Sequence, residues 1–220
     1  AIDTPLGTIL HTGDWKIDPE PQLGEQTDIE ALTALGDEGV LAMVCDSTNV
    51  FVEGESGSEG VVRQNLIELI GSLTGRVAVT TFASNVARVA TVIEAARQAG
   101  RSVCLVGRSM HKITDAAIAT GVIEDLPDLI SEDQAGSLPD DNLLFLCTGS
   151  QGEARAALGR ISRDDHRHIS LGDGDTVIFS SRVIPGNEKG IYDMQNALAE
   201  KGVRVIADKM TDGPIHVSSC

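Results

Sequence analysis

Small polar clusters follow several apolar segments of the chain, and they contain the residue types that could do chemistry. Directly after the segment 6–11 comes Gly13-Asp14, where the glycine permits a tight turn and the carboxylate can project from a strand end. Ligands gather at such strand ends in open α/β sheets, and a carboxylate there can bridge two divalent cations. The pattern alone favours the simpler alternative, in which Asp14 stabilises a turn.

Two further clusters have the same position relative to an apolar segment. Asp46 follows the segment 40–45 within the turn-forming sequence Asp-Ser-Thr-Asn, and here a turn and a site role are equally open. Ser84 follows the segment 76–81, where the start of a helix could bind an anion through its free N–H groups. An ordinary helix cap is the alternative for Ser84, and the pattern alone favours it.

One arginine and several histidines are weaker indications of a functional site. Arg108 follows the segment 102–106, and its guanidinium fork would suit a phosphate, although the pattern alone again favours an ordinary helix cap in this segment. His216 stands near the end of the sequence, where a lone histidine is usually exposed and idle. His166 and His168 have the spacing of a metal-binding pair, but the charged stretch around them favours a solvated loop. The sequence Gly-Ser-Gln-Gly after the segment 143–147 is one residue short of the serine-hydrolase elbow.

The elements that must position these clusters alternate along the chain. Short apolar runs predict strands over 6–11, 40–45, 76–81, 102–106, 143–147, 175–180 and 203–206. Most runs are continuous rather than alternating, as in parallel strands that are buried on both faces. Helical spacing predicts helices over 57–74, 84–99 and 189–201, and the polar stretch 131–142 is predicted to be a loop. We therefore expect an α/β fold with a largely parallel sheet flanked by helices, and one polar cleft along a sheet edge.

Composition narrows the class of partner. The 220 residues include 17 Lys and Arg against 33 Asp and Glu, giving a net charge of −16. This balance argues against DNA wrapping and against anionic membranes, but it permits an enzyme that grips a few phosphates in a narrow channel. No apolar run approaches the 18 or so residues of a membrane span. Cys45, Cys104 and Cys147 lie in apolar runs and are predicted to be buried thiols, which suggests a reducing cytoplasm.

Seven motifs in a fixed order carry a resemblance that covers essentially the whole chain. They read TGDWKID, CDSTN, FASNVAR, GRSM, CTGSQGE, DTVIFSSRVIPGNE and IHVS. The series resembles bacterial ribonuclease J, a family of nucleases with a metallo-β-lactamase fold and an inserted β-CASP domain. The resemblance implies that residues 1–48 end the first lactamase half, that residues 49–213 form the β-CASP domain, and that residues 214–220 begin the return to the lactamase core.

The resemblance also assigns roles by motif position. It implies two zinc ions in the complete enzyme, with Asp14 as a metal ligand and Asp46 as the acidic residue of the first β-CASP motif, both catalytic. It implies that the 5′-monophosphate of RNA is held by Ser84, Arg108, His216 and Ser218. The expected reaction of the full-length protein is two-zinc phosphodiester hydrolysis, from the 5′ end with some endonuclease action.

Departures from the family pattern limit what this chain is expected to do. The HxHxDH motif is absent, and Cys220 stands where a β-CASP histidine is expected. The first residues lack a start methionine, as in a chain cut from something longer. With Asp14 as its one predicted zinc ligand, the chain alone is expected to be inactive. A non-catalytic nucleotide- or phosphate-binding module and a β-CASP hydrolase of another substrate remain alternatives, and a homo-oligomer remains open.

Overall fold

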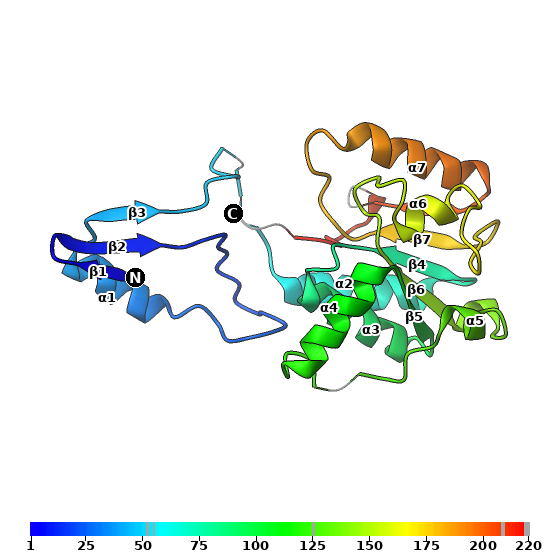
Figure 1. Cartoon of the computed structure of the whole chain (residues 1–220), viewed down its shortest axis with the longest axis horizontal. Helices are drawn as coiled ribbons and strands as arrows, with labels where there is room; N and C mark the ends of the chain where they lie inside the picture. Colours follow the sequence, from blue (N-terminus) through cyan, green and yellow to red (C-terminus); the bar gives the residue numbers. More distant parts are fainter. Residues whose placement is uncertain (52, 55, 125, 208–209, 218–220) are drawn as a thin grey trace.

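The computed structural model describes residues 1–51, 53–54, 56–124, 126–207 and 210–217, and its strands form two separate sheets (Figure 1). The smaller sheet has the order β1-β2-β3, with strands β1 (Ile2–Thr4), β2 (Gly7–His11) and β3 (Ala42–Val44). Figure 1 shows it standing apart from the larger body, to which extended segments join it. The expected domain limits at residues 48 and 213 stay a prediction.

The larger sheet has the order β5-β6-β4-β7-β8, and all four strand pairs are parallel. Its strands are β4 (Val77–Thr80), β5 (Ser102–Val106), β6 (Leu143–Cys147), β7 (Thr176–Phe179) and β8 (Arg204–Ile206). Every residue of β4, β6 and β7 is buried, which explains why these strands are continuous apolar runs in the sequence. The predicted class of α/β fold with a largely parallel sheet is confirmed.

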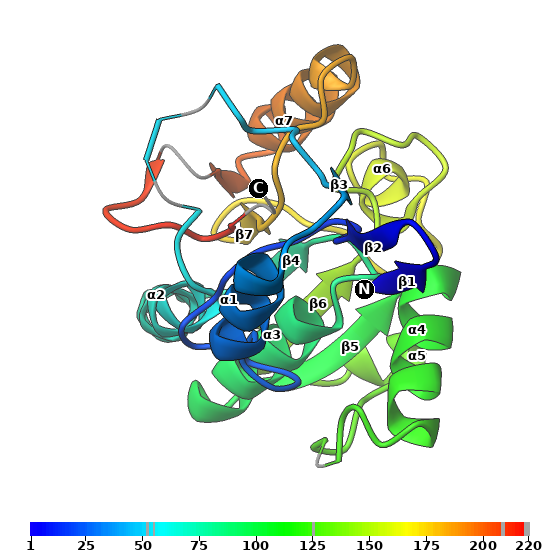
Figure 2. The same cartoon turned by 90° about the vertical axis from the view of Figure 1, so that its left-hand side faces the viewer.

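Helices cover both faces of the larger sheet (Figure 2). On one face lie α2 (Glu59–Ser72) and α3 (Val86–Gln98). The helix α4 (Arg108–Ala119) packs against the same core, near the β5 edge. On the other face lie α5 (Glu132–Ala135), α6 (Ala157–Ile161) and α7 (Glu188–Glu200). The smaller sheet is accompanied by α1 (Ile29–Glu38). None of the described helices has the length and apolar character that a membrane span requires.

The ends of the helices follow the local chemistry of the sequence. Helices α2, α3 and α7 begin and end within two residues of the predicted limits. Asn85 caps α3, because its side chain accepts a hydrogen bond from the backbone N–H of Arg88 at 3.0 Å. Gly100, at φ +69°, then lets the chain leave the helix. Because Asn85 is the cap, Ser84 lies outside the helix with an exposed side chain.

The prediction of a plain loop over 131–142 is wrong in part. Ser131 and Gln134 form a capping box, in which each side chain bonds to the other's backbone, and this nucleates the short helix α5. A 3-10 helix, Asp140–Asn142, precedes β6. Both helices are too short to show a periodic apolar pattern, and the same is true of the unpredicted strand β1.

Burial of the thiols differs between the two sheets. The prediction that Cys45 is buried is wrong, because Cys45 follows β3 in the smaller sheet and is exposed. No residue of β1, β2, β3 or α1 is buried. In this sheet an apolar run therefore does not imply a buried strand. Cys104 and Cys147 lie in the larger sheet and are buried, as predicted.

We expect the thiols to differ in reactivity. Burial raises the pKa of Cys104 to about 12 and also raises the pKa of Cys147, so neither forms the reactive thiolate at neutral pH. Exposed Cys45 should therefore be alkylated in the folded chain, whereas Cys104 and Cys147 should react only after unfolding. Mass spectrometry of peptides after brief maleimide treatment checks this, and rapid labelling of Cys104 in the folded chain would contradict it.

Candidate functional site

Two adjacent cavities lie where the larger sheet meets the loops of the smaller sheet. Their volumes are about 1100 Å³ and 540 Å³, and Val217 lines both. The walls include Phe82 and Ser84 after β4, Ser150 after β6, and Ser181 after β7. The polar clusters that follow these strands therefore do meet along one edge of the sheet, as parallel strands require.

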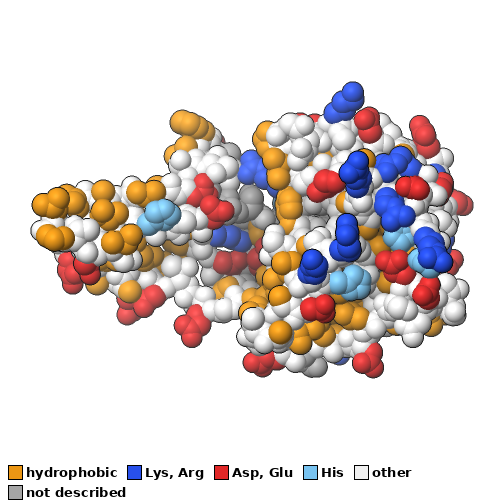
Figure 3. All heavy atoms as spheres, viewed as in Figure 1, with side chains coloured by type: hydrophobic (Ala, Val, Ile, Leu, Met, Phe, Trp, Pro, Cys, Tyr) orange, Lys and Arg blue, Asp and Glu red, His pale blue; other side chains and the backbone are white. Residues whose placement is uncertain are grey.

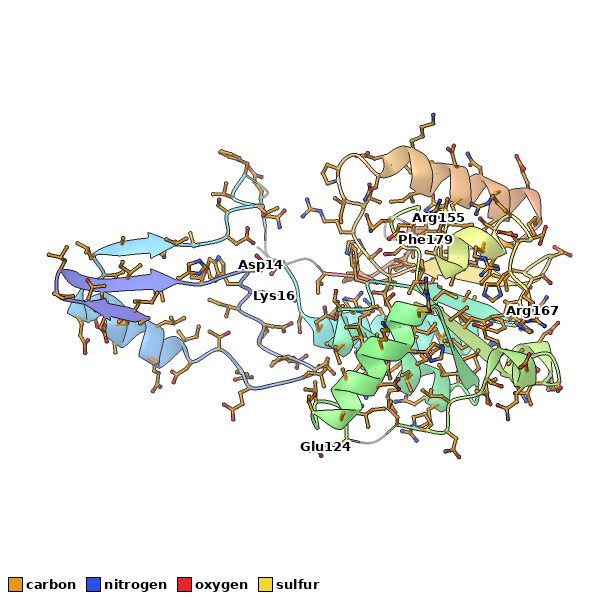
Figure 4. All side chains as sticks on the ribbon, viewed as in Figure 1. Asp14, Lys16, Glu124, Arg155, Arg167 and Phe179 are labelled. Carbon is orange, nitrogen blue, oxygen red and sulfur yellow. The ribbon has the colours of Figure 1, made fainter. Side chains whose placement is uncertain are left out.

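The smaller cavity brings together Asp14 and Ser84, which are 70 positions apart in the sequence (84 − 14). Asp14 is exposed and stands on the segment that runs from β2 toward the larger body, where Figure 4 labels it together with Lys16. Ser84 reaches the cavity from the loop between β4 and α3. Two residues that the sequence singled out separately thus line one site.

The larger cavity brings together Asp46 and His216. The carboxylate of Asp46 accepts hydrogen bonds from the hydroxyl of Thr48 at 2.6 Å and from its backbone N–H at 2.9 Å. These bonds, the hydroxyl's first, hold the pKa of Asp46 below its usual range. The indole N–H of Trp15 donates to the backbone oxygen of Asp46 at 3.1 Å and so ties the two motif loops together. The turn around Asp46 is therefore real, and it presents an ionised carboxylate to the cavity.

Several polar residues of the larger cavity were not assigned to a site from the sequence. They are Ser181, Arg182, Tyr192 and Gln195. Arg182 donates to the side-chain oxygen of Asn49 at 2.6 Å, across the cavity from β7. The signal that could have found it is the one used for the other clusters, because the sequence Ser-Ser-Arg follows the predicted strand 175–180.

Gln151 fixes the loop that carries Arg182. Its side chain is buried, donates to the backbone oxygen of Arg182 at 2.8 Å, and accepts from the backbone N–H of Ile184 at 2.9 Å. One amide therefore satisfies two backbone groups of the loop after β7. The wall of the larger cavity is held by this side chain from the loop after β6.

Arg88 is a fully buried cation that joins the segments around both cavities. Its guanidinium forms a two-pronged ion pair with Glu59, with nitrogen–oxygen distances of 2.8 and 2.9 Å. It also donates to the hydroxyl of Ser180 at 2.7 Å and to the backbone oxygen of Ile215 at 3.1 Å. The start of α2, the end of β7 and the residue before His216 are thus held by one side chain.

Asp18 extends the same connection to the segment that carries Asp14. Its carboxylate accepts from the hydroxyl of Ser58 at 2.7 Å and from the backbone N–H of Glu59 at 2.9 Å, at the start of α2. Burial alone would raise the pKa of Asp18, but these bonds and those from Glu20 and Lys16 outweigh it and hold the pKa well below its usual value. The loop after Asp14 is therefore anchored by a carboxylate that must be ionised.

Folding stability is expected to depend on the ionisation of Asp18. A carboxyl group whose pKa is lowered by folding contributes stability above its unfolded value of 3.8, and this contribution is lost as the pH falls below that value. The stability difference between the unchanged chain and Asp18→Asn should therefore be largest at neutral pH and shrink below the unfolded pKa. Urea unfolding over a pH series measures it, and a difference that stays constant with pH would contradict the role of Asp18.

Arg108 is a predicted site residue that the structure places away from the two cavities. It is the first residue of α4 and is exposed. Ser218 and Cys220 lie outside the described residues. His166 and His168 approach Glu132 and Asp133, at 4.0 and 3.0 Å respectively. Across the described part of the chain, no group of three or more His, Cys, Asp or Glu side chains is arranged to hold a metal ion.

Comparison with known protein families identifies the family to which the chain belongs. The family described as "Ribonuclease J, beta-CASP domain" matches residues 74–198, which is more than half of the chain. The chain belongs to the ribonuclease J family. The match confirms the resemblance carried by the seven motifs, and its range contains α3 to α6 and the strands β4 to β7.

Members of the ribonuclease J family match almost the whole chain. A ribonuclease J of Sinorhizobium meliloti is 50% identical over 218 residues, which are 99% of this chain and 38% of that protein. Ribonuclease J 1 of Streptococcus pyogenes is 42% identical over 220 residues, 99% of this chain and 39% of the relative. A ribonuclease J of Thermus thermophilus is 40% identical over 206 residues, 94% of this chain and 36% of the relative. The chain thus spans less than two fifths of each relative's length.

Proposed function

We propose that this chain is the RNA-holding part of a ribonuclease J-type nuclease and that it binds the 5′-monophosphate end of RNA in the two cavities. The observation that carries the proposal is the meeting of polar side chains from the ends of β4, β6 and β7 with those of the linking segments. The name ribonuclease J, which the relatives bear, supports RNA as the substrate.

The proposed phosphate contacts have the chemistry that a monoester needs. Ser84, in the smaller cavity, can donate a hydroxyl hydrogen bond to phosphate oxygens, and His216, in the larger cavity, can donate an imidazole N–H. Arg182 adds a guanidinium to the wall of the larger cavity. Arg108 and Ser218 remain proposed contacts by motif position alone. A cytoplasmic location and a homo-oligomer likewise stay predictions.

Hydrolysis of the RNA is proposed for the longer protein rather than for this chain. Three carboxylates line the smaller cavity, but Asp18 already accepts bonds from the start of α2 and Glu59 is paired with Arg88. Asp14 is left as the one proposed zinc ligand, whereas a two-zinc site needs several His and carboxylate ligands. The donor set of this chain does not fit the metal pair by itself. We therefore expect the purified chain to hydrolyse no RNA.

Binding to two RNAs that differ only at the 5′ end tests the proposal. Fluorescence anisotropy should give about tenfold tighter binding for 5′-monophosphorylated than for 5′-hydroxyl RNA, about 1.4 kcal/mol, because charged hydrogen bonds to the phosphate are lost. His216→Ala should reduce this ratio. Arg97→Gln, which changes an exposed arginine on α3, should leave it unchanged.

Two outcomes would count against the proposal. Equal affinity for the two RNAs would remove the 5′-phosphate site. A nucleoside 5′-monophosphate that binds as tightly as the phosphorylated RNA would favour the alternative of a nucleotide-binding module, because the rest of the RNA strand would then contribute nothing.

A further inference from the structure

Several exposed cations in the described part of this acidic chain have no carboxylate partner. Basic side chains elsewhere pair readily, as Arg76 does with Asp175 and Lys201 with Asp164. In the part of the chain that the structure describes, six exposed residues form no ion pair or side-chain hydrogen bond: Arg108, Lys112, Arg155, Arg167, Lys189 and Arg204. We call the first four, which lie on and around α4 and α6, the basic face. Exposed cations without a carboxylate partner are unexpected in a chain with 33 Asp and Glu residues. Where several of them lie close together, they indicate an anion-binding surface.

The basic face has a common location in the fold. A side chain at Gly107 would collide with the hydroxyl of Thr148, and that hydroxyl accepts the backbone N–H of Ala157 at 3.3 Å. The start of α4 and the start of α6 therefore meet, and this brings Arg108 and Arg155 to the same edge of the sheet. Figure 4 labels Arg155 and Arg167 on the side where α4 and α6 lie, and Figure 3 shows Lys and Arg side chains across that side, with Asp and Glu side chains between them.

The basic face is continuous with the cavities through one loop. Ser150 lines the larger cavity, and Arg155 stands five residues further along the same loop between β6 and α6. A strand held in the cavity can therefore continue over α4 and α6 without leaving the protein surface. Arg108, which lines neither cavity, has a place in this arrangement.

We propose that the basic face binds the sugar-phosphate backbone of a part of the RNA that lies outside the cavities, an inference that rests on the proposed function. Three of the four cations are arginines, whose planar forks match phosphate oxygens. The face therefore contacts phosphates without reading sequence. Its cations also offset, locally, the repulsion between RNA and a chain of net charge −16.

The test compares RNAs of two lengths, both 5′-monophosphorylated, on two double variants of the chain. Arg155→Gln/Arg167→Gln removes two cations from the basic face, and Lys189→Gln/Arg97→Gln removes the same charge from α7 and α3. For single-stranded RNA of about 20 nucleotides, the first variant should weaken binding about tenfold and reduce the log–log salt dependence by about 0.7 for each arginine. Binding of an RNA of about 3 nucleotides, which only fills the cavities, should not change.

The outcomes separate this inference from the proposed function. If the two double variants bind the long RNA alike, with the same salt dependence, the basic face is no RNA surface, even where the preference for a 5′-phosphate persists. If the long RNA binds through the face and the 5′ group has no effect, the face stands and the proposed 5′ site fails. Long RNA that binds the unchanged chain not at all overturns both. If poly-glutamate instead binds the unchanged chain and loses affinity for Arg155→Gln/Arg167→Gln, while RNA binds both alike, that result assigns the surface to an acidic protein and overturns the inference.

Discussion

Arg88→Ala is expected to lower the free energy of unfolding by about 3–5 kcal/mol, the usual cost of breaking a buried ion pair by removing one partner. Arg88 is 0% exposed and the Glu59 side chain is 16% exposed, so the remaining carboxylate would lie largely out of water without a counter-charge. The substitution also removes the donors to Ser180 and to the backbone oxygen of Ile215. Urea unfolding at neutral pH measures the change.

Arg97 offers a matched control on the same helix. It also forms two hydrogen bonds to a glutamate, Glu94, but its side chain is 60% exposed. Exposed pairs contribute about 0–1 kcal/mol, so Arg97→Ala should hardly change the stability. Equal effects of the two substitutions would show that burial of the Arg88 pair does not matter, and would contradict the account of how α2, β7 and the residue before His216 are joined.

Gly152→Ala is expected to have the second-largest effect, a loss of about 3 kcal/mol from backbone strain and overpacking together. Gly152 has φ +78°, and a β-carbon there would lie 2.5 Å from the backbone nitrogen of Ile191 and against the backbone of Gly190. The obstruction is backbone at the start of α7, which cannot rotate away. The loop after β6 would have to move off α7, and Gln151, which holds the loop of Arg182, would move with it.

Gly174 separates the two causes of this loss. Its φ of +86° is similar, but a β-carbon there would meet nothing within 4 Å. Gly174→Ala should therefore cost only the conformational strain, about 1 kcal/mol, and the difference between the two variants gives the cost of the collision. Thermal unfolding of both variants makes the comparison. A Gly152→Ala chain as stable as Gly174→Ala would mean that the loop and α7 are not in contact.

The positions of the strands in the larger sheet could be predicted from the sequence, because a strand that is buried on both faces is a continuous apolar run. The apolar run 143–147 became β6 with the predicted limits, and the run 102–106 became β5. The order of the strands in the sheet could not be predicted from these runs, because it depends on how the segments between them cross over the sheet. Likewise, the rule that polar residues gather at strand ends found Asp14 and Ser84 and the cavity that they share.

Other features depend on contacts that no local pattern carries. Cys45 has an apolar neighbourhood in the sequence like that of Cys104, yet it is exposed because burial is decided by the layers around the sheet. Arg88 reaches Glu59 and Ile215, which are 29 and 127 positions away, so its burial could not be seen in the sequence around it. Arg108 was grouped with Ser84 by motif order, whereas the fold places it at the start of α4.

The proposed binding of the 5′-phosphate end of RNA in the two cavities is tested most directly by the fluorescence of Trp15. Trp15 is the single tryptophan of the chain, lines the larger cavity, and bonds to the backbone of Asp46. Titration with a 5′-monophosphorylated oligonucleotide should change this fluorescence saturably, at about tenfold lower concentration than the 5′-hydroxyl form requires. If neither RNA changes the Trp15 signal, or if both change it at the same concentration, the cavities do not hold the phosphorylated end.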